Sequence, residues 1–248
     1  MYTAHHHRHT DDRMIHVKLP STDPRRLPFF LALEEWTARA LPAADYFFTW
    51  TVNDTVICGR NQDIAAEVNL DYCRARGIDV VRRKSGGGCV FADRHNIMTS
   101  FVTVATDVQS TFAKYIGLLA AQLRAMGIQA EVSGRNDILV GDRKVSGSAF
   151  YHLPGRSIVH GTMLYDTDMD KMLNAITPSR AKLQSHKVTS VAGRITTVRA
   201  LRPEMTMDAF HAALIRGLAD KEYTLTPAQV HEVEHMEQDY YKPDWLDI

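Results

Sequence analysis

The chain has 248 residues, of which 45% are apolar and 23% charged, the composition of an ordinary globular protein long enough for one large domain. The 29 Lys and Arg residues are balanced by 29 Asp and Glu residues, so the formal net charge at pH 7 is zero. This balance argues against a broad surface for nucleic acid or anionic membranes, because both need an excess of positive charge. We therefore expect no nucleic acid and no membrane among the partners.

The opening segment and the cysteines predict the compartment. Residues 1–13, MYTAHHHRHTDDR, are polar throughout, whereas a secretory leader has a basic segment followed by an apolar core. Nowhere does the chain approach the roughly 18 consecutive apolar residues of a membrane-spanning helix. Cys58, Cys73 and Cys89 lack CxxC spacing, which indicates neither a disulfide framework nor a zinc knuckle. We expect a cytoplasmic protein with reduced thiols.

Two regions are expected along the chain. Residues 1–13 are predicted to be a disordered, His-rich terminus, with metal binding by its histidines as the alternative. Residues 14–248 contain no low-complexity linker and no repeat of fixed period, which favours a single catalytic domain.

Apolar periodicity predicts the secondary structure of the second region. The expected strands and helices are, in chain order, a strand at 14–19, a helix at 28–41, strands at 46–52 and 55–59, a helix at 108–126, strands at 137–150 and 157–165, and helices at 168–176, 207–218 and after Thr226. Asn53-Asp54 indicates a hairpin between its flanking strands, and Pro154-Gly155 indicates an antiparallel pair. Gly127 should end its helix, and Thr226 with Gln229 should form a capping box. Adjacent strands in the middle of the chain favour an α+β fold with a mixed or largely antiparallel sheet and flanking helices over a Rossmann-type fold.

The segment RRKSGGGCVF at residues 82–91 places three cations before three consecutive glycines. Adjacent glycines cost backbone entropy and pack nothing, so they indicate unusual dihedral angles or the close approach of another group. A glycine-rich turn can direct several N–H groups at one anion, and guanidinium groups can add bidentate hydrogen bonds to phosphate or carboxylate. The segment has neither a P-loop ending nor GxGxxG spacing. The alternative is a solvated charge run beside a flexible turn.

A second polar segment covers residues 133–149, SGRNDILVGDRKVSGSA. If residues 142–149 are extended, one face carries Asp142, Lys144, Ser146 and Ser148. The Lys144 ammonium could then reach a phosphate or polarise a carboxylate. The alternative is a solvent-facing edge strand, in which lysine is common.

A third segment, VHGTM at residues 159–163, places His160 and Thr162 on one face of a predicted strand. Such a histidine either contacts a ligand or is hydrogen-bonded within the core, and the second is the more common outcome for a buried polar group.

Taken in order, RRKSGGGCVF, SGRNDILVGDRKVSGSAF, HGTML and KVTSVAGRITTV resemble the lipoate–protein ligase family, within the biotin/lipoate ligase fold. The resemblance runs from about Phe29 to Leu218, and four segments in the family's order are more specific than any one alone. It implies a class II synthetase-like catalytic domain, a mixed or antiparallel sheet with flanking helices. It also implies the activity, in which ATP and lipoate give lipoyl-AMP and pyrophosphate, and the lipoyl group passes to a lysine of a lipoyl domain.

The resemblance also implies roles for individual residues. ATP or the adenylate would be held by Arg83, Ser85, Gly86, Gly87, Gly88, Cys89, Val90, Phe91, Asn136, Asp137 and Lys144. Lipoate would be held by Lys144, Ser148, His160, Gly161 and Thr162. The catalytic candidate is Lys144, which contacts nucleotide and lipoate carboxyl oxygens in the family. Mg²⁺ is expected to bridge the phosphates, with Asp137 as its proposed ligand. The acceptors would be lipoyl domains of 2-oxoacid dehydrogenase E2 subunits or the glycine cleavage H protein.

The chemistry explains the need for cations at these positions. Attack of a carboxylate on the α-phosphate brings anions together, so the site must neutralise both reactants and the developing charge on phosphorus oxygens. Arg83, the N–H groups of the three glycines and Lys144 could supply that neutralisation. In the second step Lys144 would stabilise the carbonyl oxygen while the acceptor lysine displaces AMP.

Departures from the family pattern keep other readings open. Ala92-Asp93 stands where many ligases have His-Asp, Cys89 stands where alanine is frequent, and the sequence reaches Ile248 without the C-terminal accessory domain of larger members. Activation would then need a separate accessory subunit. One alternative is an octanoyl or lipoyl transferase that takes its acyl group from an acyl-carrier or lipoyl-protein donor through Cys89. Another is a lipoate-binding module without turnover. A biotin ligase is disfavoured because its basic glycine–arginine signature is absent.

Overall fold

A computed structural model describes residues 13–134, 136–176 and 194–246 of the chain. The predictions for the His-rich segment at residues 1–12 therefore lie outside the described residues, as does the 187–193 part of the fourth motif. Within the described residues, no helix is both long and apolar enough to cross a membrane.

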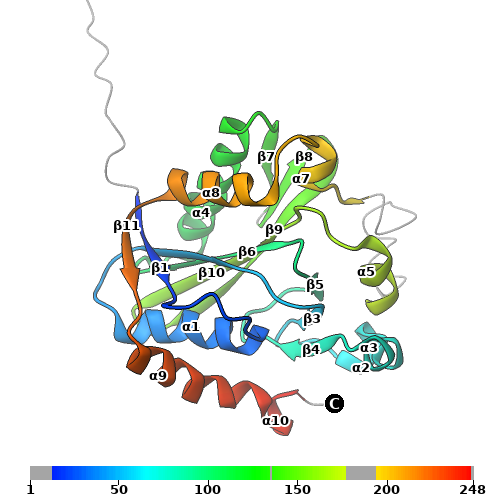
Figure 1. The fold of residues 1–248 in the computed structure, drawn as a ribbon, viewed down its shortest axis with the longest axis horizontal. Helices are drawn as coiled ribbons and strands as arrows, with labels where there is room; N and C mark the ends of the chain where they lie inside the picture. The colour runs from blue at the N-terminus through cyan, green and yellow to red at the C-terminus, as the bar shows by residue number, and fades with distance from the viewer. Residues whose placement is uncertain (1–12, 135, 177–193, 247–248) are drawn as a thin grey trace, which may run out of the picture.

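An eight-stranded sheet forms the centre of the fold, in the order β11-β1-β2-β6-β10-β9-β8-β7 (Figure 1). Its strands are β1 (Met14–Lys18), β2 (Tyr46–Trp50), β6 (Ile97–Thr103), β7 (Ala130–Ser133), β8 (Asp137–Val140), β9 (Arg143–Leu153), β10 (Arg156–Met163) and β11 (Ala219–Thr224). β1 runs parallel to β2 and β11, and the neighbouring pairs from β2 to β7 are antiparallel. The predicted α+β fold with a mixed, largely antiparallel sheet is confirmed.

Helices cover both faces of this sheet (Figure 1). α1 (Leu27–Ala40) and α9 (Pro227–Glu237) lie on one face, and α4 (Val108–Ala125) and α8 (Met207–Leu218) lie on the other. Strand alternation divides the core between them, because successive side chains point to opposite faces. Phe48 of β2 packs in the cluster beneath α1, whereas its neighbour Phe47 packs in the cluster beneath α4. The predicted helices at 28–41, 108–126, 168–176 and 207–218 are each confirmed to within one residue or two.

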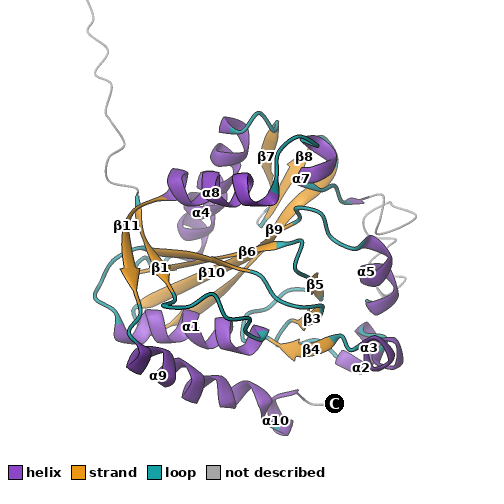
Figure 2. Ribbon diagram, in the orientation of Figure 1, coloured by secondary structure: helices purple, strands orange, loops and turns teal. Residues whose placement is uncertain are grey.

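A smaller sheet lies beside one end of the large one (Figure 2). It has the order β4-β3-β5 and consists of β3 (Thr55–Cys58), β4 (Asp79–Arg82) and β5 (Val90–Ala92). Three short helices accompany it: α2 (Ile64–Glu67), α3 (Leu70–Arg76) and α5 (Met169–Ala175). The two sheets form the walls between which the functional site is built.

The predicted hairpin around Asn53-Asp54 is wrong, because its two strands belong to different sheets. β2 pairs with β1 and β6, whereas β3 pairs with β4 and β5. All four residues of β3 are buried, and so are four of the five in β2. Strands that are apolar on both faces need neighbours on both edges and covers on both sides, and this requirement outweighed the local turn signal. The Asn53-Asp54 turn instead carries the chain from one sheet to the other.

Helix ends follow the sequence rules, and the C-terminal part of the chain returns to the site. Gly127 has φ of 81° just beyond α4, and Thr226 and Gln229 form the predicted capping box of α9. The remaining elements are α7 (Val198–Leu201), the 3₁₀ segment η2 (Gln238–Tyr241) and α10 (Pro243–Leu246). Trp245 of α10 donates its indole N–H to the carbonyl of Arg82 across 2.9 Å. The base of the glycine segment is therefore held by a residue more than 160 positions later.

Candidate active site

A cavity of about 330 Å³ lies between the two sheets, a volume suited to a small ligand. Its walls come from β3, β5, β6, β9, β10, α5 and the glycine loop, which we define as Ser85–Cys89. Apolar side chains such as Trp50, Met98 and Met172 line part of it, and Arg83, Lys144 and Arg194 supply cations. An elongated acid with an apolar chain and an anionic end matches these two kinds of wall.

Most of the residues predicted from the sequence meet at this cavity, although they come from three separate segments. The lining includes Arg83, Gly87, Gly88, Cys89, Val90, Phe91, Asn136, Lys144, Ser148, His160, Gly161 and Thr162. Ser85 and Asp137 lie directly behind the lining, in contact with His160 and Lys144 respectively. The structure thus brings the three polar segments of the sequence into one place, while the ligand roles proposed for their residues stay predictions.

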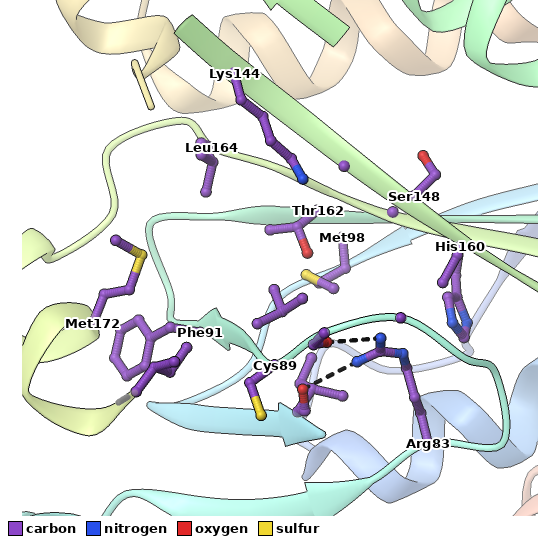
Figure 3. Close-up of a pocket in the computed structure, with 18 of the residues that line it drawn as sticks. Arg83, Cys89, Phe91, Met98, Lys144, Ser148, His160, Thr162, Leu164 and Met172 are labelled. Atoms are coloured by element: carbon purple, nitrogen blue, oxygen red, sulfur yellow. Dashed lines mark hydrogen bonds between the residues drawn. The ribbon is translucent and has the colours of Figure 1, made fainter. Parts of the chain in front are cut away.

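Arg83 holds the glycine loop together from the inside (Figure 3). Four of its five N–H groups donate within the protein: Nε to the Ser85 hydroxyl, Nη1 to the Ile57 carbonyl, and Nη2 to the Gly86 and Gly88 carbonyls, over 2.6 to 3.0 Å. Its side chain is only 4% exposed, and burial lowers the pKa of its guanidinium. The structure therefore gives Arg83 an organising role in the loop.

A buried chain of hydrogen bonds continues from this loop into the large sheet. Ser85 Oγ lies 2.7 Å from His160 Nε2, and His160 Nδ1 lies 2.8 Å from Glu34 Oε2. Each of the three side chains is at most 8% exposed. Because the Glu34 carboxylate accepts, the pattern assigns the proton to His160 Nδ1, so that Nε2 accepts from the Ser85 hydroxyl. We call this series of hydrogen-bonded side chains, Arg83–Ser85–His160–Glu34, the buried polar chain.

The far end of the buried polar chain is fixed inside the sheet. Ser100 donates its hydroxyl to Glu34 Oε1 across 2.5 Å, and Trp50 donates its indole N–H to Ser100 Oγ across 2.9 Å. Every side-chain nitrogen and oxygen along this path therefore has a hydrogen-bond partner, as is usual for buried polar atoms. The Ser–His–carboxylate order resembles that of a nucleophilic triad, but Ser85 lies outside the cavity lining and its oxygen is held by Arg83. The arrangement positions the loop.

The charge run at residues 82–84 is largely buried, which excludes the reading of a solvated face. Arg82 is 5% exposed and donates to the carbonyls of Gly59, Arg60 and Gln62. Lys84 pairs with the buried Glu35 carboxylate across 2.5 Å, and Glu35 also accepts from the Tyr240 hydroxyl. These cations stabilise the base of the loop through protein contacts.

Lys144 reaches the cavity because β9 contains an irregularity. Ile138 pairs with Ser146 but Leu139 pairs with Lys144, so Val145 is an extra residue in the ladder. The predicted common face of Asp142, Lys144, Ser146 and Ser148 is therefore wrong, since the regular alternation is interrupted at Val145. Figure 3 shows the Lys144 side chain extending into the space between β9 and the glycine loop, whereas the Ser148 hydroxyl points away from it.

The Lys144 ammonium has a defined setting at the cavity wall. Its Nζ lies 2.8 Å from Asp137 Oδ1, and about a third of its side chain is exposed. A Cβ atom at Gly147 would collide with Nζ, so a glycine there leaves room for the ammonium to lie against the strand. Asn136 donates its side-chain amide to the Ser148 carbonyl across 2.9 Å, which fixes the turn before Asp137.

The two cysteines near the loop are partners of each other. Cys89 Sγ donates to Cys58 Sγ across 3.3 Å, and this contact is the main cause that raises the pKa of Cys89 and lowers that of Cys58. Among the described residues, no group of three or more His, Cys, Asp or Glu side chains could hold a metal ion. A cation at this site would need ligands from its substrates.

Sequence reasoning missed several residues of this site. Glu34 and Glu35 lie in the segment that was predicted as an amphipathic helix, and Trp50 lies in a segment that was predicted as an apolar strand. Buried acids within an apolar helix are the signal that could have found Glu34 and Glu35, because buried carboxylates need partners. Arg194 lies in the fourth motif, KVTSVAGRITTV, but no role of its own was predicted for it.

Comparison with known proteins confirms the family that the sequence motifs resemble. The family model for the lipoyl protein ligase A/B catalytic domain matches residues 28–219. Lipoate–protein ligase 1 of Staphylococcus aureus is 34% identical over 220 residues, which span 86% of this chain and 67% of that protein. Lipoate–protein ligase LplJ of Bacillus subtilis is 33% identical over 234 residues, which span 90% and 70% respectively.

Solved structures share the fold. A bi-partite lipoate protein ligase from Thermoplasma acidophilum, described with its E2 lipoyl domain, superposes with a TM-score of 0.81 and 25% identity, covering 94% of this chain and 95% of that one. A lipoate–protein ligase A bound with ATP has a TM-score of 0.81 and 24% identity, covering 94% and 98%. The fold is that of a lipoate ligase catalytic domain. With the family model and the two bacterial relatives, the chain belongs to the lipoyl protein ligase A/B catalytic-domain family.

The buried polar chain predicts a specific sensitivity at Glu34. Replacing Glu34 by Gln keeps the shape but places an NH₂ group opposite one of two donors, His160 Nδ1–H or the Ser100 hydroxyl. We expect the free energy of unfolding in urea at pH 7 to fall by about 1–3 kcal/mol. The matched control is Glu131→Gln on the exposed part of β7, which should change it by less than about 0.5 kcal/mol. Equal effects of the two substitutions would show that the buried polar chain does not stabilise the folded protein.

Proposed function

We propose that this chain is an ATP-dependent lipoate–protein ligase, which activates lipoate as lipoyl-AMP and transfers the lipoyl group to a lysine of an acceptor domain. The observation that carries the proposal is one cavity that joins an apolar wall, an anion-seeking glycine loop and the Lys144 ammonium. Family membership and the two bacterial lipoate–protein ligases support it. Residues 14–248 act as the catalytic domain, and the chain works in the cytoplasm.

In the first half-reaction the lipoate carboxylate attacks the α-phosphorus of ATP, and the bond to pyrophosphate breaks. The glycine loop offers backbone N–H groups to the phosphates, while Arg83 keeps the loop in shape through the Gly86 and Gly88 carbonyls. Lys144 lies across the cavity and contacts both the carboxylate and the phosphate oxygens. Its charge reduces the repulsion between two anionic reactants at the moment they meet.

The lipoyl chain lies along the apolar wall. Trp50, Met98 and Met172 offer that wall flexible and aromatic surfaces, and His160 and Thr162 of β10 line the same space. Ser148 and Gly161 contribute the adjacent backbone of β9 and β10. A solved relative from Thermoplasma acidophilum contains bound lipoic acid.

Mg²⁺ supplies charge neutralisation at the phosphates when it is bound. Asp137 would hold it, because its carboxylate already lies beside the cavity, 2.8 Å from Lys144 Nζ. One carboxylate together with phosphate oxygens and water suits Mg²⁺, which retains several waters in nucleotide sites. Without nucleotide, Lys144 neutralises the same carboxylate.

In the second half-reaction the acceptor lysine attacks the carbonyl carbon of the mixed anhydride, an amide forms, and AMP leaves. Lys144 stabilises the developing charge on the carbonyl oxygen. The acceptor is a lipoyl domain of a 2-oxoacid dehydrogenase E2 subunit or the glycine cleavage H protein. Support for a lipoyl domain comes from the Thermoplasma acidophilum ligase, which is described with its E2 lipoyl domain.

The structure disfavours transfer through a Cys89 thioester. A nucleophilic cysteine needs a thiolate, usually produced by nearby positive charge or a base. Here the hydrogen bond to Cys58 and the burial of the side chain raise the pKa of Cys89, so the thiol keeps its proton.

Purified chain supplied with lipoate, MgATP and an apo lipoyl domain should add one lipoyl group to the domain and release one AMP for each group added. Mass spectrometry of the domain and chromatography of the nucleotide measure the two products. If the domain is modified from an acyl-carrier thioester without ATP, and this modification is lost in Cys89→Ser, the chain is a transferase and the proposed ligase activity is wrong. If the chain binds lipoate but catalyses neither reaction, it is a lipoate-binding module without turnover.

Lys144→Ala should lower the rate of lipoyl-AMP formation by about 100-fold, the effect of removing one preorganised charge from a reaction of this kind. The rate is measured as pyrophosphate released in the presence of lipoate, and circular dichroism checks the fold. Lys18→Ala is the matched control, because Lys18 pairs with Glu222 across 3.1 Å at the exposed end of β1, as Lys144 pairs with Asp137. An unchanged rate in Lys144→Ala would place the catalytic cation elsewhere.

A further inference from the structure

Cys58 and Cys89 form a pair of thiols at the edge of the cavity. Their sulfur atoms lie 3.3 Å apart, and neither is part of a disulfide. The backbone brings them together independently of side-chain rotamers, because Ile57 of β3 pairs with Val90 of β5 in antiparallel register. Positions 58 and 89 follow directly in that register and therefore face each other.

The two thiols differ in access. Cys58 is completely buried, within a strand that has β4 on one side and β5 on the other. Cys89 lines the cavity and is partly exposed, so it is the thiol of the pair that we expect a small solute to reach. Cys73 belongs to the same apolar cluster but has no hydrogen bond to either thiol among the contacts described, and its side chain is 1% exposed.

The surroundings favour one thiolate within the pair. Cys89 donates a hydrogen bond to Cys58, and Arg82 and Arg83 lie close enough to stabilise negative charge. These causes lower the pKa of Cys58, although burial opposes them. A thiol whose pKa is lowered, in contact with a second and partly exposed thiol, supplies the two sulfur atoms that a disulfide needs.

We propose that Cys58 and Cys89 are a reversible disulfide site, oxidised by a small peroxide that enters the cavity. One sulfur attacks a peroxide oxygen, the O–O bond breaks, and a sulfenic acid and water are produced. The other sulfur displaces the second water and the S–S bond forms. The two thiols lose two protons and two electrons, which reduce hydrogen peroxide to two molecules of water. A dithiol restores both thiols by exchange.

The disulfide changes the glycine loop, and this consequence rests on the proposed function of the loop as a nucleotide site. Bonded sulfur atoms lie about 2.05 Å apart, so the pair must approach by more than 1 Å. Because Cys58 lies between two strands, we expect Cys89 and the adjoining loop to take up this movement. Gly88, next to Cys89, accepts from Arg83 Nη2 across 2.8 Å, and that contact is then displaced. We expect ATP to bind at least tenfold more weakly to the oxidised chain.

The experiment treats reduced protein with hydrogen peroxide, quenches with an alkylating reagent and maps peptides without reduction. We expect a cross-linked pair of peptides containing Cys58 and Cys89, two hydrogens lighter than the reduced pair, while Cys73 stays alkylated. Dithiothreitol should restore three alkylated cysteines. The control Cys73→Ala should form the same cross-link, and Cys89→Ala should form none. A link between other cysteines, or sulfinic acid at Cys89 without a cross-link, would overturn the site.

Calorimetry with MgATP then tests the effect on the loop in reduced, oxidised and re-reduced protein. A tenfold weaker and reversible affinity in the wild type and in Cys73→Ala supports the proposal. Equal affinities of reduced and oxidised protein would overturn the effect on the loop. If reduced protein binds no ATP, the proposed function fails, and peptide mapping still decides whether the disulfide site exists.

Discussion

Arg83 and Glu34 are 49 positions apart in the sequence, and the buried polar chain between them connects the small sheet to the large one. Each link joins a different element: the end of β4, the glycine loop, β10 and α1. In a low-dielectric interior such bonds are strong when all are made and costly when one is missing. The shape of the glycine loop, and with it the cavity that the loop closes, depends on this pairing.

The cations near the cavity fall into two groups, those that bind protein groups and those that line the cavity. A sequence of three adjacent basic residues suggests three ligands for an anion, yet Arg82, Arg83 and Lys84 each bind protein carbonyls or carboxylates. Lys144, delivered by an extra residue in β9, lines the cavity with about a third of its side chain exposed, and Arg194 lines the same cavity. The neutral total of the chain thus conceals buried, paired cations that build the base of the loop and two further cations, Lys144 and Arg194, that line the cavity.

The limits of sequence reasoning have physical causes. Helices such as 108–126 were predictable because their periodicity and caps are local, and the four ordered motifs predicted the family. The prediction of a hairpin at Asn53-Asp54 was wrong because a strand buried on both faces pairs with segments that are distant in the sequence. The prediction that Lys144 and Ser148 share a face was wrong because one extra residue, Val145, reverses the alternation of side chains. The local sequence gives no signal for this extra residue. The role of Glu34 was missed because its partners come from β6 and β10, although an acid within an apolar helix was a signal that it needs partners.

The most direct test is amide hydrogen exchange in wild type and Ser85→Ala, which removes the middle of the buried polar chain. The reporters are the amides of Arg60, bonded to the Ser85 carbonyl, and Arg83, bonded to the Cys58 carbonyl, each across 2.9 Å. Our account predicts at least tenfold faster exchange at both, with amides of α4 unchanged. Unchanged exchange at Arg60 and Arg83, or equal acceleration throughout α4, would show that the chain does not hold the loop.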